Sequence, residues 1–471
     1  MKINSNIHLA KQLFLWIIVM SFLGCENNLN DLKPVSYATT PDVFLDGFTS
    51  GLIYAAFSGT VLTGFQVDKS VTYNNTSASM RFDVPNVNDP NGAYTGGAFF
   101  TSVGRDLSGY NALTFWAKSS QAATVGVVGF GIDLGANTYP ASLNNLQLST
   151  VWKKYIIPIP DASKLKMEKG MFYISAGPDG NGNGYTFWVD EVKFENLGTI
   201  VQQQASINNG ADTSVTTFTG VTTTIAGLSS IFNMPNGYNQ AVITSPNYFS
   251  FTSSNVAVAT VDAGGVITTV GTGSAVITAT LGGVKAKGSL AINSLGAFTH
   301  APTPSKPSAN VISIFSDAYT NVPVEYYNGY WAPYQTTQSA NFNVNGDAIL
   351  NYTNFNFVGI QFSKPTINAS TMTHLHIDLY IPNTLFAGEL FTIQVVDFGA
   401  DGVYGGGDDT SASLTYTSPT KLVSKNWVSF DIPFTSLPGL TSRAHLAQII
   451  FSTNINNISN FYADNIFFYH N

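Results

Sequence analysis

The chain has 471 residues, of which 10% are charged and 13% aromatic, and its formal net charge at pH 7 is −8. This length exceeds what one hydrophobic core usually organises and predicts about three domains. Neither the net charge nor any local run of Lys and Arg provides a basic surface, so we expect no nucleic-acid partner. Few charges, abundant glycine and many short apolar runs favour an extracellular all-β protein.

Residues 1–24 have the pattern of a secretion signal. Two lysines precede the apolar run 13–20, and a glycine stands directly before Cys25, the only cysteine. This arrangement resembles the lipobox of bacterial lipoproteins, which implies cleavage before Cys25 and lipidation of its thiol. We therefore expect residues 25–33 to form a tether, and a lipid anchor to hold the protein on the extracellular side of the outer membrane. An ordinary secretion signal is the alternative, because Phe22 replaces the usual Leu.

The segment from 34 to 198 consists of short apolar or alternating runs separated by turn residues, without a sustained helical period. Clear examples are the runs 113–118, 154–159 and 185–194. Runs of this length and spacing are typical of antiparallel strands in a sandwich. We predict a jelly-roll domain over residues 34–198.

A plainer segment follows at 199–294, rich in Thr, Val, Ala and Gly. Its runs 253–262 and 265–280 closely resemble the bacterial Ig-like group 2 domain, which implies a Greek-key sandwich that serves as a spacer. Ligand binding by its loops is the alternative. Pro-rich residues 295–308 predict a stiff linker, and the third domain is predicted at 309–471.

Landmarks of the first domain recur in the third in nearly the same register. The interval from Trp152 to Asp190 is 38 residues, and that from Trp427 to Asp464 is 37. Each tryptophan stands six residues before a proline, and another aspartate lies near the start of each domain. We predict an all-β protein with two jelly-roll β-sandwich domains of one type, separated by an Ig-like β-sandwich.

Four aspartates predict metal sites at the edges of these two domains. The first and last strands of a jelly roll commonly lie side by side, which would bring Asp46 near Asp190 and Asp317 near Asp464. Paired carboxylates repel one another unless a cation lies between them, and oxygen ligands suit Ca²⁺. Jelly-roll carbohydrate-binding modules, which these domains resemble, often hold a structural Ca²⁺ there. The alternative is that each aspartate caps a turn.

An aromatic loop in the third domain is the strongest candidate site. Five aromatic residues fall within nine positions punctuated by Gly, Pro and Asn: Tyr326, Tyr327, Tyr330, Trp331 and Tyr334. Aromatic rings held on a β scaffold bind sugars by stacking, so we predict these five as glycan-binding residues. The alternative is that they cover the edge of their own sheet. The remaining tryptophans beyond the leader lie in strand-like runs, where buried indoles are expected: Trp116, Trp152, Trp188 and Trp427.

The Gly- and Asp-rich segment 397–409 resembles a calcium loop in composition but lacks the spacing and the closing Glu of an EF-hand, so a hairpin loop is predicted. Its Tyr404 is a candidate to flank a ligand cleft. We find no carboxylate pair at the spacing of a β-sandwich glycosidase and no motif for a nucleophile, a metallohydrolase or a nucleotide. The sequence therefore predicts a protein that is not an enzyme.

Several segments resemble surface proteins that bind glycans. Runs 105–118, 152–160 and 187–191 are similar to N-terminal modules of secreted glycan-utilisation lipoproteins, and runs 301–304, 310–319 and 397–409 to terminal modules of the same proteins and of laminarin-type β-glucanases. The resemblance implies a starch-utilisation-system-like surface protein that captures a neutral polysaccharide, with β-glucan such as laminarin favoured, for a TonB-dependent transporter and hydrolases. Residues 327–331 depart from the usual Asn-Pro-Asn-Trp, which leaves the sugar open. A structural adhesin or spacer without a glycan site is the alternative.

Overall fold

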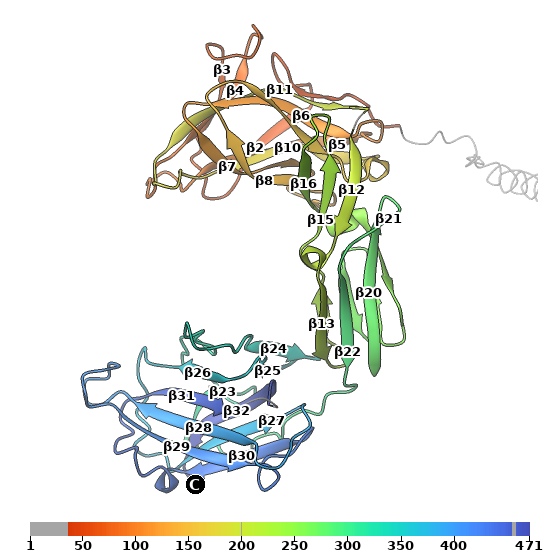
Figure 1. Ribbon diagram of the computed structural model, residues 1–471. Coiled ribbons are helices and arrows are strands. Elements are labelled where there is room, and N and C mark those ends of the chain that lie inside the picture. The colour runs from red at the N-terminus through yellow and green to blue at the C-terminus, as the bar shows by residue number, and fades with distance from the viewer. Residues whose placement is uncertain (1–35, 199, 455–457) are drawn as a thin grey trace, which may run out of the picture. The chain divides into compact units, whose positions relative to one another are not determined.

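The computed structural model describes residues 36–198, 200–454 and 458–471 (Figure 1). Over these residues the regular elements are β-strands and short 3-10 turns, which confirms the all-β class. No helix among them has the length and apolar character needed to cross a membrane. The predicted signal peptide, Cys25 and the predicted tether lie outside the described residues.

Contacts between residues divide the chain into two compact units. The N-terminal unit comprises the described residues up to Ser206 together with 228–250 and 280–286, and the C-terminal unit comprises 207–227, 251–279 and 287–471. The residues predicted as an Ig-like domain are therefore shared between the two units. We describe each unit by itself.

The N-terminal unit is a sandwich of two sheets. One sheet has the order β3 (Phe65–Asp68), β4 (Ser79–Val84), β11 (Tyr185–Glu195), β6 (Ala112–Ser119), β9 (Lys153–Pro158), with β1 (Asp42–Phe44) paired to β11. The other has the order β12 (Val201–Ser206), β15 (Ser229–Asn233), β16 (Asn239–Thr244), β8 (Ala141–Leu148), β7 (Ala123–Phe130), β10 (Glu168–Ala176), β5 (Thr95–Arg105), β2 (Leu52–Ala56). Strands β12, β15 and β16, from the predicted Ig-like range, extend this second sheet beyond β8.

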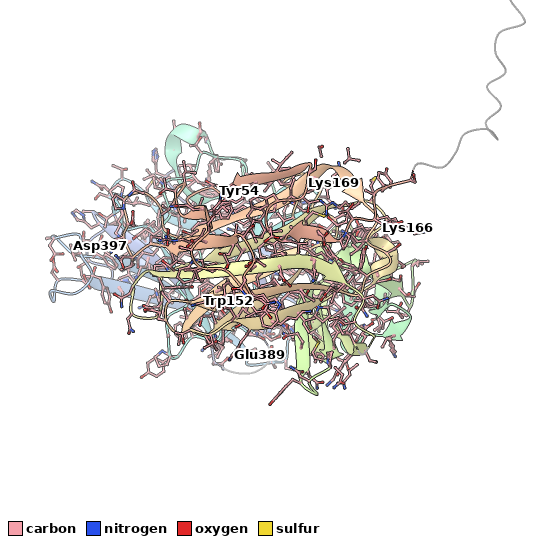
Figure 2. All side chains as sticks on the ribbon, turned by 90° about the horizontal axis from the view of Figure 1, so that it is seen from above. Tyr54, Trp152, Lys166, Lys169, Glu389 and Asp397 are labelled. Atoms are coloured by element: carbon pink, nitrogen blue, oxygen red, sulfur yellow. The ribbon has the colours of Figure 1, made fainter. Side chains whose placement is uncertain are left out.

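Strand periodicity decides which aromatic residues reach the core of this unit. Along β11, Phe187 and Val189 are buried, whereas Trp188 between them points to the outer face and is half-buried. Trp116 and Trp152 are likewise only partly buried, and Trp152 is labelled in Figure 2. The expectation of buried indoles is therefore wrong at these three positions, and also at Trp427 of the C-terminal unit, which is partly buried. For Trp116 and Trp188 the reason is that a strand buries only alternate residues, whereas Trp152 directly precedes β9.

The remaining strands from the predicted Ig-like range form two small sheets. One has the order β13 (Asp212–Thr217), β22 (Ser289–Ser294), β20 (Gly273–Leu281), β17 (Phe249–Ser253), with β21 (Val284–Lys285) paired to β20, and the other has the order β14 (Thr222–Thr224), β19 (Val266–Thr269), β18 (Ala259–Val261). In the C-terminal unit the Pro-rich residues 295–308 lie against protein. Phe298 is buried, with its ring centroid 4.7 Å from that of Phe218, and the amide of Asn465 donates to Pro302 O at 3.1 Å.

Most of the C-terminal unit is a second sandwich, drawn in blue in Figure 1. Its larger sheet has the order β24 (Asn341–Val344), β25 (Asp347–Tyr352), β32 (Phe461–Tyr469), β27 (His374–Tyr380), β30 (Trp427–Pro433), with β23 (Val311–Phe315) paired to β32. The smaller sheet has the order β26 (Phe357–Gln361), β31 (Leu446–Thr453), β28 (Leu390–Asp397), β29 (Thr410–Thr417). Apolar residues from both sheets form one core between them.

The six-stranded sheets of the two sandwiches share one strand order, which confirms the predicted repeat. In each, an early strand (β1 or β23) pairs antiparallel with the last strand (β11 or β32), as the landmark spacing predicted. Asp190 and Asp464 occupy equivalent places on the last strand, and each is followed by a residue with positive φ, Glu191 at 45° and Asn465 at 50°. The sequence repeat therefore corresponds to a structural repeat.

Candidate functional site

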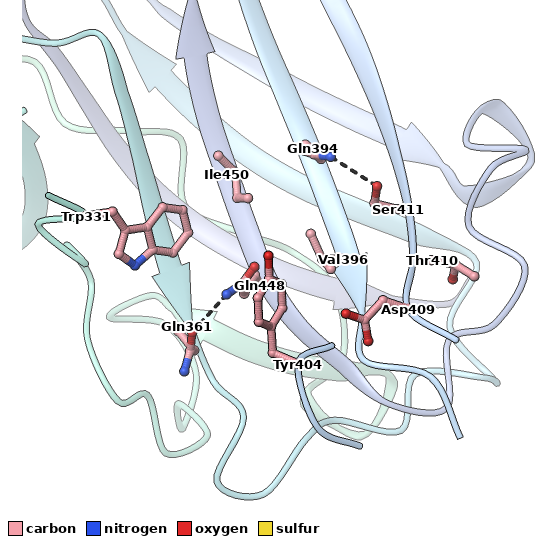
Figure 3. A pocket seen from close by; sticks show the side chains of 10 residues that line it. All are labelled: Trp331, Gln361, Gln394, Val396, Tyr404, Asp409, Thr410, Ser411, Gln448 and Ile450. Carbon is pink, nitrogen blue, oxygen red and sulfur yellow. Dashed lines mark hydrogen bonds between the residues drawn. The ribbon is translucent and has the colours of Figure 1, made fainter. Parts of the chain in front are cut away.

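A cavity of about 770 Å³ lies on the outer face of the four-stranded sheet of the C-terminal unit, and we call it the sheet-face pocket (Figure 3). Ten residues line it: Trp331, Gln361, Gln394, Val396, Tyr404, Asp409, Thr410, Ser411, Gln448 and Ile450. They come from all four strands of the sheet and from two loops. The predicted aromatic loop and the Gly/Asp loop, which are distant in sequence, thus meet at one pocket.

Alternation along the strands builds the floor of this pocket. On β26, Val358 and Ile360 are buried in the core, so Gly359 and Gln361 face outward. The register pairs Gln361 with Gln448 across β26 and β31, and β28 continues the same row. The outward residues of neighbouring strands therefore form rows that cross the sheet, and polar and apolar side chains alternate among them.

Trp331 lies against this floor because the strand beneath it carries glycine. A Cβ atom at Gly359 would collide with the outer edge of the six-membered ring of the Trp331 indole. The indole also lies 6.3 Å, centroid to centroid, from the ring of Phe357, which faces the same side of β26. One side of the indole is thus supported by the sheet, and Trp331 remains partly exposed at the pocket.

A chain of hydrogen bonds holds Trp331 in this position. The indole Nε1 donates to the hydroxyl of Tyr326 at 3.2 Å, and that hydroxyl donates to Gln361 Oε1 at 2.6 Å. Gln361 Nε2 in turn donates to the carboxylate of Glu325 at 3.2 Å. Because each group has a fixed partner, the indole is held in one orientation relative to the sheet.

Glu325 anchors this chain from below. Burial acts to raise its pKa, but hydrogen bonds from the side chain and backbone of Ser363 and from Lys364 outweigh that effect and lower the pKa to about 2. Lys364 Nζ lies 3.0 Å from the other carboxylate oxygen. Glu325 is therefore ionised across the physiological pH range and acts only as an acceptor.

Tyr404 reaches the pocket from the Gly/Asp loop, as the sequence suggested. Its side chain is 73% exposed and its ring lies 5.5 Å from that of Phe398. The loop is held by its own carboxylates, since Asp408 accepts from Ala400 N at 2.6 Å and Asp409 accepts from Gly405 N at 2.8 Å. This internal bonding is that of a hairpin loop, and it places Tyr404 at the edge of the pocket.

Two side-chain oxygens of residues that line the pocket are buried and have no hydrogen-bond partner among the described residues. Within the described ranges, Asp409 Oδ1 and Thr410 Oγ1 make no hydrogen bond. A buried polar atom without a partner costs about 1–3 kcal/mol. Both atoms belong to residues that line the pocket, so this part of its wall is polar.

The five aromatic residues predicted as a glycan site lie in different environments. Trp331 lines the pocket and Tyr326 supports it from behind. Tyr327 instead packs against the core, where its hydroxyl donates to Ile314 O at 3.1 Å. Tyr330 and Tyr334 are 54% and 78% exposed but do not line the pocket.

Sequence reasoning missed most of the polar floor: Gln361, Gln394, Gln448, Asp409, Thr410 and Ser411. Glutamines at the outward positions of otherwise apolar strands were the available signal. They become a site only when the register brings four strands together.

In the N-terminal unit the predicted calcium pair does not fit a cation. Asp190 is buried, and one of its carboxylate oxygens accepts from Tyr73 N at 2.8 Å and from the hydroxyl of Thr76 at 2.7 Å. Asp46 accepts from Ser77 N at 2.6 Å. Protein donors therefore already reach both carboxylate oxygens of Asp190 and one oxygen of Asp46, which leaves little for Ca²⁺ to bind.

In the C-terminal unit the equivalent carboxylates line a cavity of about 440 Å³. Asp317, Asp347 and Asp464 all reach it, although the described residues contain no group of three or more His, Cys, Asp or Glu close enough to hold a metal as they stand. Asp464 is only 4% exposed, and burial, reinforced by the charges of Asp347, Asp317 and Asp378, raises its pKa to about 7. His300 Nδ1 lies 2.5 Å from Asp347, and the clustered carboxylates are oxygen ligands of the kind that suits Ca²⁺.

Two segments match the models of known families. Residues 47–196 match carbohydrate binding domain 30, and residues 246–283 match the immunoglobulin-like domain of intimin. No protein of curated function matches the chain.

Similar solved structures include carbohydrate-binding modules. A family 30 module of a cellulosomal cellulase of Clostridium thermocellum is 18% identical over 34% of this chain and 96% of its own, with a TM-score of 0.24. A family 11 module of the same organism, in complex with a β-1,3-1,4-mixed-linked tetrasaccharide, is 19% identical over 29% and 85%, with a TM-score of 0.22. The CBM22-1–CBM22-2 tandem domain of Paenibacillus barcinonensis Xyn10C is 10% identical over 93% and 99%, with a TM-score of 0.22. On the family models, residues 47–196 are similar to a carbohydrate-binding module and residues 246–283 to an Ig-like domain.

Proposed function

We propose that the protein captures a neutral polysaccharide, with a β-glucan such as laminarin favoured, and does not cleave it. The observation that carries this proposal is the sheet-face pocket, where Trp331 and Tyr404 flank a floor of amide and hydroxyl groups. Aromatic rings stack on the apolar faces of sugars while polar floor groups bind their hydroxyls. The match of residues 47–196 to carbohydrate binding domain 30 supports glycan binding by the N-terminal unit as well.

Each stacked ring contributes about 1 kcal/mol, so a single pocket with two rings predicts only weak binding at one site. A second glycan site on the same chain and many chains on one cell would raise the overall affinity. The proposed location on the cell surface would provide many copies of the binding site. Lipidated at Cys25, the protein would stand on the outer membrane beside a TonB-dependent transporter and hydrolases that process the captured polymer.

A structural Ca²⁺ is proposed for the C-terminal unit alone. Asp317, Asp347 and Asp464 would hold it, with backbone carbonyl groups near the cavity completing the ligands. Asp317 follows β23, Asp347 begins β25, and Asp464 lies on β32. The ion would neutralise Asp464 and connect these three parts of the sheet.

Affinity electrophoresis and calorimetry of the full mature chain test the proposed function. The panel contains laminarin, mixed-linkage glucan, starch, xylan, mannan and alginate. We expect retention by a neutral glucan, and binding about tenfold weaker for Trp331→Ala because stacking is lost. Tyr334→Ala is the matched control, since this exposed ring lies on the same loop outside the pocket.

Retention that Trp331→Ala leaves unchanged would remove the sheet-face pocket as the site and direct attention to the N-terminal unit. An absence of retention on every polymer would favour the structural adhesin or spacer.

A further inference from the structure

The orientation of the partly buried Gln361 amide at the pocket follows from the charge of Glu325 behind it. Glu325 is ionised and can only accept, so the Gln361 group that faces it at 3.2 Å must be the amide nitrogen. Gln361 Oε1 therefore points the other way and accepts from the Tyr326 hydroxyl at 2.6 Å and from Gln448 Nε2 at 2.8 Å. The position of Glu325 thus determines how Gln361 presents itself to the pocket.

The orientation of the Gln448 amide follows in the same way. Because Gln448 uses its amide nitrogen to reach Gln361, its amide oxygen is left as a hydrogen-bond acceptor, and no partner for this oxygen is seen in the part of the chain that the structure describes. Gln448 is 6% exposed, so the orientation of its side chain is restricted by packing. Asp409 adds a second acceptor, since Oδ2 accepts from Gly405 N and the buried Oδ1 has no partner among the described residues.

The charge of the residues that line the pocket also favours a neutral ligand that donates hydrogen bonds. Among the ten lining residues Asp409 is the one that carries a charge, and there is no Lys, Arg or His to balance it. A sugar hydroxyl can donate to Gln448 Oε1, whereas the buried Asp409 Oδ1 acts on the ligand through its charge. A carboxylate or sulfate group offers no donor and brings a second negative charge next to Asp409, where partial removal of water strengthens the repulsion.

We propose that Asp409 makes the sheet-face pocket reject acidic glycans and accept those whose hydroxyls are free. This inference rests on the proposed function and adds the residue that decides the charge class of the ligand. Gln448 supports this selectivity as a hydrogen-bond acceptor for the sugar. Glu325 is a positioning residue, because it orients the amide of Gln448 through the amide of Gln361.

The test compares one polymer in two charge states. Laminarin and mixed-linkage glucan are each titrated into the full mature chain beside the same polymer oxidised at C6 to the uronate. We expect the wild type to bind the neutral form at least about tenfold more tightly than the oxidised form, and Asp409→Asn to reduce this ratio to within about threefold. Asp212→Asn removes the same charge from an exposed strand of the same unit and leaves the ratio at its wild-type value.

The outcomes separate this inference from the proposed function. Equal binding of neutral and oxidised polymers, or preferential binding of alginate, overturns the role of Asp409 while glycan capture stands. A wild-type ratio that Asp409→Asn does not change assigns the selectivity to another residue and also overturns it. Binding of neither form overturns both proposals.

Discussion

Three residues in the structure carry unusual electrostatic environments whose effects differ in sign. Glu325 has a pKa lowered to about 2, because Ser363 and Lys364 outweigh the effect of burial, and it supports the candidate site. Asp464 has a pKa raised to about 7 by burial and by neighbouring carboxylates. Glu168 in the N-terminal unit also has a pKa raised to about 7, mainly by burial. Ionised Glu325 stabilises the folded state, whereas ionised Asp464 and Glu168 destabilise it.

Asp464 therefore predicts a stability that depends on pH in the absence of Ca²⁺. Its folded-state pKa lies above the value in the unfolded chain, so the folded protein binds more protons between about pH 4 and pH 7, and stability falls as pH rises through this window. A difference of one between the folded and unfolded pKa values corresponds to about 1.4 kcal/mol of stability. We expect Asp464→Asn to be more stable than the wild type at pH 8 in EDTA, and equal to it near pH 4.

Urea unfolding at both pH values measures this difference. The asparagine can still accept from the backbone N–H of residue 465, so the substitution removes the charge while keeping the hydrogen bond. A variant that is less stable than the wild type at pH 8 in EDTA would contradict the account.

At the scale of elements, β26 shows how a strand divides its residues between two tasks. Val358 and Ile360 pack in the core. On the opposite face, Gly359 leaves room for the Trp331 indole and Gln361 provides a polar contact at the pocket. Sequence periodicity predicted strands of this kind. It did not predict which strands would neighbour one another, because register depends on packing between segments that are distant along the chain.

Gly359→Ala is therefore expected to impair binding without unfolding the protein. Alanine is tolerated in strands, but its methyl group would push the Trp331 indole off the sheet. We expect at least about tenfold weaker glycan binding, measured by calorimetry, with a shift in tryptophan fluorescence and little change in the midpoint of unfolding.

Gly109→Ala is the matched control for this substitution. Its backbone lies outside the positive-φ region, and no atom lies within 4 Å of the added methyl group. Normal affinity in Gly359→Ala would show that the position of the indole on the sheet does not matter for binding.

At the scale of the whole molecule, the two similar sandwiches differ at the aspartates that the sequence predicts as metal ligands. Asp190 and Asp464 each accept from the backbone N–H of the next residue, but only Asp190 also accepts from a loop, at Tyr73 N and the Thr76 hydroxyl, whereas Asp464 faces other carboxylates. The two halves of the repeat thus satisfy equivalent carboxylates by different means.

This difference predicts one Ca²⁺ per chain, and not the two expected from the sequence. Calorimetric titration of the full mature chain after treatment with EDTA should give a stoichiometry near one. We expect Asp317→Asn to weaken the binding, because this side chain lines the cavity, and Asp46→Asn to leave it unchanged. A stoichiometry of two, or an effect of Asp46→Asn, would restore the symmetrical arrangement.

The sequence by itself determined the all-β class, the repeat with its strand-adjacent aspartates, and the choice of Trp331 and Tyr404 as candidate site residues. These follow from periodicity, landmark spacing and turn-forming residues, which are local properties of the chain. Only the tertiary structure decided that Tyr327 faces the core, that Trp116 and Trp188 lie on an outer face, and that glutamines from three strands form the floor of a pocket. The physical reason is that an individual strand has two faces, and only its packing against another sheet decides which face is buried.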